Sequence, residues 1–211
     1  MIRNGKAFQL FAELLREATA DAETVLDIGT SQRFAKELAP FRELLAYTNY
    51  LAAGYRPEDR GRDTCDLDLD IQDIALPDSS QDCVICLEVL EHVQDPFKAV
   101  TELIRILRPG GRLLLTVPFM TGYHGKGETP DHAGYPDYWR FTHQGLERAF
   151  RVLQDLQVRP VAGPIETRLR LLRADRLVDV FPLRQLLDRV DAPRAGKLTD
   201  RHIVTGRKAS S

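Results

Sequence analysis

The chain has 211 residues, of which 43% are hydrophobic and 28% charged, and its formal net charge is −2. A chain of this length can bury one hydrophobic core. Basic residues are in excess near the C-terminus, but the excess is too modest to indicate a nucleic-acid-binding protein. No apolar run reaches the roughly 20 residues that span a bilayer, so we expect no stable membrane insertion and a cytoplasmic location. Three cysteines do not make a disulfide framework, which fits a reducing compartment.

The N-terminal third alternates helical and extended patterns. In chain order, the hydrophobic spacing predicts a helix, a strand, a second helix and two more strands, at residues 6–19, 24–29, 34–45, 49–53 and 65–69. We expect Pro40 to kink or divide the second helix. The last of these strands alternates with Asp66 and Asp68, which favours a place near a sheet edge.

The stretch from Asp82 to Pro118 predicts a strand, a helix and a second strand. Residues 84–87 and 113–117 are short apolar runs typical of strands buried on both faces. Between them, apolar side chains at helical spacing predict a helix from Asp95 to Arg108, with Asp95 as N-cap and Pro109-Gly110-Gly111 as its stop. This order is the βαβ unit of a parallel sheet.

The remaining third holds an irregular segment, a helix and the last two strands. Residues 119–140 have the length of a functional loop or lid. Thr142 is expected to cap a helix, and residues 152–158 and 202–206 read as strands. A helical insertion at about 164–198 precedes the last strand. Its predicted roles are, in order of preference, a cap over the sheet edge, a homodimer interface and a membrane-surface helix. We expect an α/β fold with a doubly wound, mostly parallel, seven-stranded sheet, in a single domain over residues 1–211.

Cys83-x-x-Cys86 has the spacing of a redox or metal pair. In an extended strand, however, residues three apart point to opposite faces, so these two cysteines are expected to be core residues. The turn after the first strand also lacks the dinucleotide fingerprint G-x-G-x-x-G, because Ser31 and Phe34 occupy the second and third glycine positions. This argues against NAD or FAD.

Four segments resemble class I S-adenosylmethionine-dependent methyltransferases of the type 11 kind. They are VLDIG at 25–29, DIQDIALP at 70–77, EVLEHVQDPFKAVTELIRILRPGGRLLLTVPF at 88–119, and PDYWRFTHQGLERAF at 136–150, the last similar to a subgroup of small bacterial methyltransferases. The resemblance implies a Rossmann-like fold and S-adenosylmethionine as cofactor. It also implies in-line displacement of a methyl group onto a small-molecule or sugar-derived acceptor.

The resemblance implies a set of cofactor-binding residues. Asp27 and Gly29 would lie along the methionine part, with Thr30 and Ser31 in the turn that follows. Asp70 would accept from the adenine amine, Ile71 would lie against the ring, and Leu87 and Glu88 would border the reacting methyl group. A sulfonium and an ammonium group favour nearby carboxylates, and adenine needs an apolar wall with one acceptor.

This chain departs from the family's pattern at two places. Thr30-Ser31 replaces the last two residues of D-x-G-x-G, and the acid expected after the second strand falls on Ala53-Gly54-Tyr55. Glu58 or Asp59 is an alternative ribose ligand. The departures keep a second hypothesis open, a non-catalytic binding protein that retains the fold with degenerate cofactor motifs.

A methylated hydroxyl or amine must lose a proton, so a base is expected near the acceptor. The catalytic candidates are His92 after the fourth strand and, in the loop, His124, His132 and Asp137, with Asp131 a further candidate there. The aromatic residues Tyr123, Tyr135 and Tyr138 are candidates for the acceptor pocket, whereas Trp139 is expected to be structural. The sequence predicts no metal site.

Overall fold

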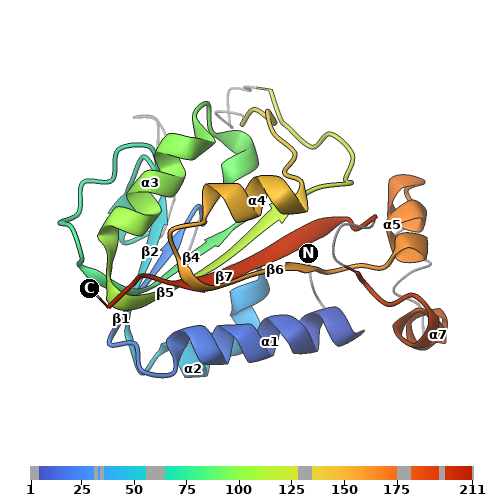
Figure 1. The fold of residues 1–211 in the computed structure, drawn as a ribbon, viewed down its shortest axis with the longest axis horizontal. Helices are drawn as coiled ribbons and strands as arrows, with labels where there is room; N and C mark the ends of the chain where they lie inside the picture. The colour runs from blue at the N-terminus through green and yellow to red at the C-terminus, as the bar shows by residue number, and fades with distance from the viewer. Residues whose placement is uncertain are drawn as a thin grey trace.

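The computed structural model describes residues 5–30, 33, 36–55, 65–127, 135–174, 182–194 and 198–210, with Lys36 and Glu37 described by their backbone only. Its strands form one seven-stranded sheet in the order β3-β2-β1-β4-β5-β7-β6 (Figure 1). The strands are β1 (Thr24–Ile28), β2 (Asn49–Gly54), β3 (Leu67–Asp68), β4 (Gln81–Leu87), β5 (Leu107–Pro118), β6 (Gln154–Pro160) and β7 (Arg201–Arg207).

The sheet is parallel except at one edge. β1 pairs in parallel with β2 and β4, β2 with β3, and β4 with β5, whereas β7 runs antiparallel to both β5 and β6. This confirms the predicted mostly parallel, seven-stranded α/β sheet. The strand order reverses between β1 and β4, and doubly wound sheets bind ligands at such a switch point, outside the carboxyl ends of the strands.

Helices cover both faces of the sheet. α3 (Pro96–Ile106) and α4 (His143–Ala149) lie on one face, while α1 (Gly5–Thr19) and α2 (Arg42–Leu45) lie on the other (Figure 1). Each face has its own buried apolar cluster, and Cys83 belongs to one cluster and Cys86 to the other. Both cysteines are fully buried. The pair is therefore split across the sheet, as predicted from strand geometry.

The prediction for the Pro109-Gly110-Gly111 segment, as the stop of the helix α3, is wrong. α3 begins as expected, with Asp95 accepting from the backbone N–H groups of Phe97 and Lys98, but it ends at Ile106, and β5 starts at once with Leu107. The glycines lie inside the strand, where Gly110 has φ +80 and donates to the carbonyl of Lys208. Pairing with the chain after β7 thus holds this segment extended.

The second predicted helix is made of two kinds of helix over its described residues. A 3₁₀ helix, Lys36–Phe41, contains Pro40 and passes directly into the four-residue α2. Proline lacks the N–H that an α-helix interior requires, so division at Pro40 was the correct alternative. Strand β6 begins two residues later than predicted, after a turn at the carboxyl end of α4.

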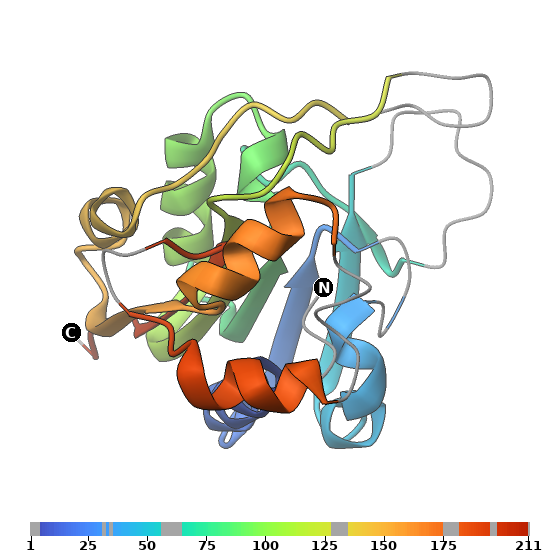
Figure 2. The ribbon, with the colours of Figure 1, turned by 90° about the vertical axis from the view of Figure 1, so that its right-hand side faces the viewer.

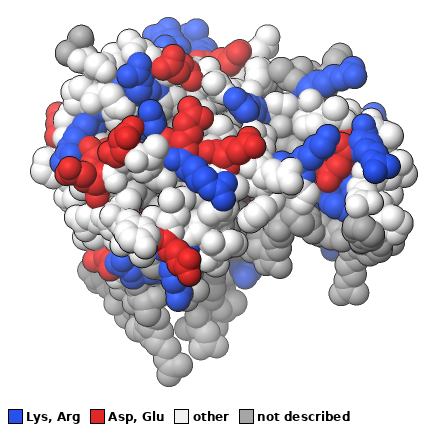
Figure 3. All heavy atoms as spheres, turned by 90° about the horizontal axis from the view of Figure 1, so that it is seen from below, with Lys and Arg blue, Asp and Glu red and all other residues white. Residues whose placement is uncertain are grey.

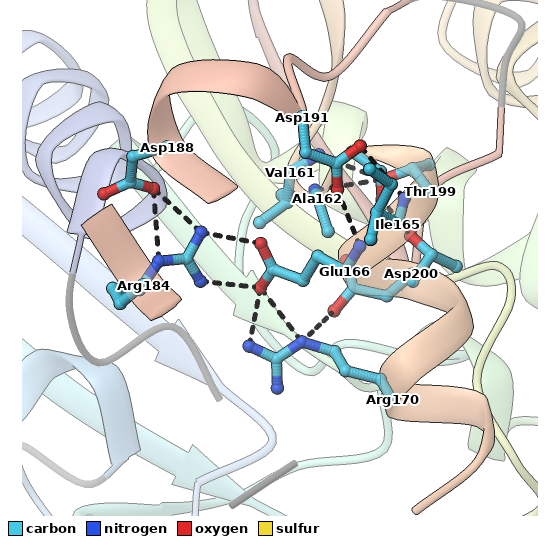
Figure 4. Close-up of polar contacts among 12 residues, drawn as sticks. Val161, Ala162, Ile165, Glu166, Arg170, Arg184, Asp188, Asp191, Thr199 and Asp200 are labelled. Atoms are coloured by element: carbon cyan, nitrogen blue, oxygen red, sulfur yellow. Dashed lines mark hydrogen bonds and ion pairs between the residues drawn. The ribbon is translucent and has the colours of Figure 1, made fainter. Parts of the chain in front are cut away.

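The helical insertion forms α5 (Pro164–Leu171) and α7 (Leu183–Val190), which lie beside the end of the sheet (Figure 2). Buried Glu166 accepts two hydrogen bonds from Arg184, at 2.9 and 2.8 Å, and two from Arg170, at 2.7 and 3.1 Å (Figure 4). Asp191 caps the start of α5 by accepting from the N–H groups of Ile165 and Glu166. Charged hydrogen bonds therefore join the two helices.

On the face formed by α1 and α2, acidic and basic side chains are interspersed (Figure 3). A mixed pattern of this kind gives no single-sign field for a nucleic-acid backbone on that face. Among the described helices, none combines the length and the hydropathy needed to cross a bilayer.

Candidate active site

The carboxyl ends of β1 and β2 meet at the switch point. Asp27 is buried in β1, and its Oδ2 accepts a 2.6 Å hydrogen bond from the hydroxyl of Tyr50 in β2. Gly29 follows with φ +83, and a Cβ at this position would lie 2.1 Å from Val89 Cγ2. Gly29 and Thr30 both donate to the carbonyl of Ala53. The turn therefore requires glycine, and it is bound tightly to β2.

The missing ribose acid has a structural explanation. A Cβ on Gly54 would lie 2.5 Å from the carbonyl oxygen of Thr30, so the backbones of the two strand ends are in direct contact there. A side chain at residue 54 would force them apart. Three positions named from the sequence lie outside the described residues, namely Ser31, Glu58 and Asp59.

Glu88 leaves β4 in a left-handed conformation, with φ 56. Its Oε1 is buried and has no hydrogen-bond partner among the described residues, while its Oε2 lies 3.5 Å from Nη1 of Arg201 in β7. A buried carboxylate oxygen without a partner is costly, and it indicates a site that expects a donor or a cation. Leu87, the residue before it, is buried in the sheet.

Asp70 follows the carboxyl end of β3. Its Oδ1 accepts from the backbone N–H of Gln72 at 2.8 Å, which fixes the carboxylate in a local turn. Ile71 is only 4% exposed and packs in the apolar cluster under the turn. The structure thus offers an acceptor on Asp70, while Ile71 supports the turn from below.

Beyond Glu88, the chain forms a 3₁₀ helix, Leu90–His92, and the loop folds over it. Glu91 is fully buried, and both of its carboxylate oxygens lack a hydrogen-bond partner among the described residues. His92 Nε2 lies 3.5 Å and His124 Nε2 lies 3.6 Å from Glu91 Oε1. The two imidazole rings meet edge to face with centroids 5.0 Å apart. Two predicted bases are therefore brought together around an acid that the sequence analysis did not select.

The protonation of this cluster departs from ordinary values. Burial raises the pKa of Glu91. The neighbouring Glu91 carboxylate raises the pKa of His124. The pKa of Glu91 rises because burial disfavours its charged form, and the pKa of His124 rises because a nearby carboxylate favours the charged imidazole.

Asp137 has a different environment from that expected of a base. Its side chain is fully buried and ion-paired through both oxygens with Arg140, and Oδ2 also accepts from the backbone N–H of His124. The hydrogen bonds from Arg140 lower the pKa of Asp137 to about 2. A carboxylate held so firmly as an anion is a weak base, so this geometry favours a role in positioning His124.

The aromatic candidates separate into two groups. Tyr135 is half-buried and meets the His92 ring edge to face, with centroids 4.9 Å apart. Tyr123 and Tyr138 are 75% and 50% exposed. Trp139 donates its indole N–H to the carbonyl of Val93, in keeping with a structural role. His132 and Asp131 lie outside the described residues.

Three residues of the site were missed from sequence: Glu91, Arg140 and Arg201. Glu91 directly precedes a histidine that was selected, so its type and place carried a signal. Arg140 lies three residues after Asp137, a spacing that permits an ion pair. Nothing in the sequence connects Arg201 with Glu88, which are distant in the chain.

Known proteins resemble this chain in sequence and in fold. The family model described as a methyltransferase domain matches residues 10–115, about half of the chain. The chain belongs to this family. A Mycolicibacterium smegmatis protein named "Probable S-adenosylmethionine-dependent methyltransferase" is 37% identical over 60 residues, and a Xanthomonas oryzae pv. oryzae ubiquinone biosynthesis O-methyltransferase is 43% identical over 47. These matches cover 28% and 22% of this chain, but only 23% and 20% of the relatives' own length.

Among solved structures, the chain is similar to Burkholderia thailandensis 1,6-didemethyltoxoflavin-N1-methyltransferase. The TM-score is 0.52 at 16% identity, over 97% of this chain and 79% of the other. That enzyme was solved with its substrate and S-adenosylhomocysteine bound. At such low identity the likeness concerns the fold alone, and the fold is the Rossmann-like one of class I methyltransferases.

Membership of this family makes S-adenosylmethionine the cofactor of the domain and methyl transfer its reaction class. The residues at the switch point fit this cofactor. It carries two positive groups, and the edge presents the carboxylates of Asp27 and Glu88, one of them with a buried oxygen that lacks a hydrogen-bond partner among the described residues. S-adenosylmethionine has no phosphate, so the absence of a glycine-rich phosphate loop does not argue against this cofactor.

Proposed function

We propose that the protein transfers a methyl group from S-adenosylmethionine to a small, polar acceptor, which includes sugar-derived compounds. The observation that carries this proposal is the unpartnered Oε1 of Glu88, buried at the carboxyl end of β4 and flanked by the switch-point turn at Gly29. A donor or cation is needed there, and the cofactor supplies both.

The cofactor would be held by residues at the ends of three strands, β1, β3 and β4. Asp27, Gly29 and Thr30, with Ser31 after them, would hold the methionine part, and Leu87 with Glu88 would border the reacting methyl group. Asp70 would accept from the adenine amine beside Ile71. When bound, the cofactor supplies a methyl group on a sulfonium sulfur. The main task of the protein is then to align the acceptor for in-line displacement.

The acceptor side would be formed by the loop over residues 90–92. His92 and His124 present imidazole nitrogens beside Glu91, so an acceptor hydroxyl or amine could lose its proton there. Tyr135 borders His92 and would wall the pocket, with Tyr123 and Tyr138 further out. The polar character of this group favours a hydroxylated or amino acceptor over an apolar one.

Calorimetry tests the proposal. Titration with S-adenosylmethionine and S-adenosylhomocysteine should give saturable binding, while NAD should give none. Positive binding would then justify a methyl-transfer assay over small hydroxyl and amine acceptors. No binding of either sulfur compound at about 1 mM, a concentration that detects binding free energies as weak as about −4 kcal/mol, would instead favour the non-catalytic alternative.

A further inference from the structure

Glu91 is the most unusual buried group in the described part of the chain. Its side chain is 0% exposed, and neither oxygen has a hydrogen-bond partner among the described residues. The nearest nitrogens, at 3.5 and 3.6 Å, are beyond ordinary charge-assisted hydrogen-bond distances of about 2.7–2.9 Å. Native proteins rarely leave a buried carboxylate in this state, and a bound ion is one of the standard explanations.

The two histidines are oriented as metal ligands are. Nδ1 of His92 contacts the carbonyl of Pro136, and Nδ1 of His124 contacts the carbonyl of Gly122 at 3.3 Å. A carbonyl only accepts, so each Nδ1 must carry the proton, and each Nε2 then presents its lone pair toward Glu91. Metal-bound histidines almost always donate their second ring N–H to a carbonyl or carboxylate in this way.

The distances also match a coordination site. One nitrogen from each ring and one carboxylate oxygen lie within 4.8 Å of one another. A metal ion with ligand bonds of about 2.0–2.2 Å in tetrahedral geometry separates its ligands by about 3.4 Å, close to the 3.5 and 3.6 Å seen here. Only the two imidazoles would need to approach each other slightly.

The surrounding loop holds the cluster in place. The carbonyl of Glu91 accepts from the N–H of Tyr138 at 2.7 Å, and Asp137, fixed by Arg140, lies 3.5 Å from Nδ1 of His124. A carboxylate behind a ligating histidine is a common supporting arrangement in metal sites.

We propose that Glu91, His92 and His124 bind one divalent transition-metal cation, Zn²⁺ or a cation of similar ligand preference. Two imidazoles and one carboxylate suit such ions and suit Mg²⁺ poorly. Three protein ligands leave a coordination position open, as in catalytic rather than structural zinc sites, and an oxygen of a bound acceptor can occupy it. At a loaded site both nitrogens of each histidine would be engaged, so the cation, by lowering the pKa of that oxygen, would take over the part otherwise assigned to the imidazoles as bases. This departs from the sequence-based prediction of no metal site.

The test is metal binding by the full chain after treatment with a chelator and desalting. Calorimetry with Zn²⁺ and absorption spectroscopy with Co²⁺ should show one equivalent bound, with no comparable binding of Mg²⁺. His124→Gln, at a half-buried position, should weaken Zn²⁺ binding more than about 100-fold, since even outer-shell changes cost 10- to 100-fold. Glu91→Gln should do the same.

His143→Gln is the matched control, because this histidine pairs with Glu147 on α4, outside the cluster, and should leave the affinity unchanged. Equal Zn²⁺ affinity of the wild type and the His124→Gln variant would overturn the proposal, as would the absence of saturable Zn²⁺ binding. Binding of S-adenosylhomocysteine is measured separately on the metal-free protein. A failure of the cofactor proposal therefore remains distinguishable from a failure of metal binding.

Discussion

Asp70 is the residue assigned to adenine recognition, and its substitution tests that assignment. Asp70→Ala should weaken binding of S-adenosylhomocysteine about tenfold to 100-fold, because a hydrogen bond to an ionised acceptor contributes roughly 1.5–3 kcal/mol. Calorimetry measures the affinity, and circular dichroism checks that the fold is intact. Asp73→Ala, in the same turn but exposed, is the control and should bind normally. Unchanged affinity of Asp70→Ala would mean that adenine lies elsewhere.

His202 is a second residue whose substitution has a measurable effect, in this case on the pH dependence of stability. It is 1% exposed in β7, beside Phe119 and His143, and its Nδ1 has no hydrogen-bond partner among the described residues. Burial, with a smaller contribution from the charge of His143, lowers the pKa of His202 to about 4. The unfolded chain therefore takes up this proton at a higher pH than the folded protein does.

The contribution of His202 therefore lowers the free energy of unfolding as the pH falls from about 6.5 to 4. Between pH 7 and pH 5 the loss is about 2 kcal/mol in the free energy of unfolding. Urea unfolding at the two pH values should show that the His202→Gln variant loses about 2 kcal/mol less than the wild type. His143→Gln should keep most of the loss, because burial is the larger cause. An identical pH dependence in the wild type and His202→Gln would contradict the prediction.

At the scale of elements, the pairing of α5 with α7 depends on Glu166. Burial alone would raise the pKa of this carboxyl group, but hydrogen bonds from Arg184 and Arg170 lower it below its ordinary value. Both helices are short, at eight residues each, so little of their stability can come from helix formation itself. The ion pairs at Glu166 therefore join α5 to α7.

Arg184→Met should therefore destabilise the protein by roughly 1–3 kcal/mol, because it leaves a buried carboxylate with one cation in place of two. Arg168→Met is the matched control, since Arg168 lies on the exposed side of α5, and it should change stability by less than about 0.5 kcal/mol. Urea unfolding gives the free energies, and hydrogen exchange shows whether the loss is confined to α5 and α7. Equal effects of the two substitutions would show that the buried ion pair is not stabilising.

At the scale of the molecule, the topology brings distant segments to one place. The loop after β5 and the first residue of β7 reach the segment that follows β4, so Glu88 can meet Arg201, and Glu91 can meet His124. The insertion lies at the same end and connects to this region through Asp200, which contacts Arg170 and Arg201. Whether the insertion also forms a homodimer stays a prediction.

The sequence by itself determined the class of the sheet and the order of the main elements along the chain, and it predicted that the cofactor lies at the carboxyl ends of the strands. These follow from local signals: apolar runs define β4 and β5, Asp95 begins α3, and the glycine after Asp27 makes the first turn. Such signals depend on residues close together in the chain, so they can be read without the fold. The prediction was wrong where pairing with a distant segment overrode the local preference. Pro109-Gly110-Gly111 was expected to be a helix stop, but it is part of β5 because it pairs with the chain after β7.

Only the tertiary structure decided what the site residues do. It showed that Gly54 has no room for the expected acid and that Asp137 is bound to Arg140. It also showed that Glu91 is buried beside two histidines, with no hydrogen-bond partner for its carboxylate among the described residues. Burial and the partners of a side chain set its charge and its chemistry. Both depend on segments that are far apart in sequence and meet only when the sheet has formed.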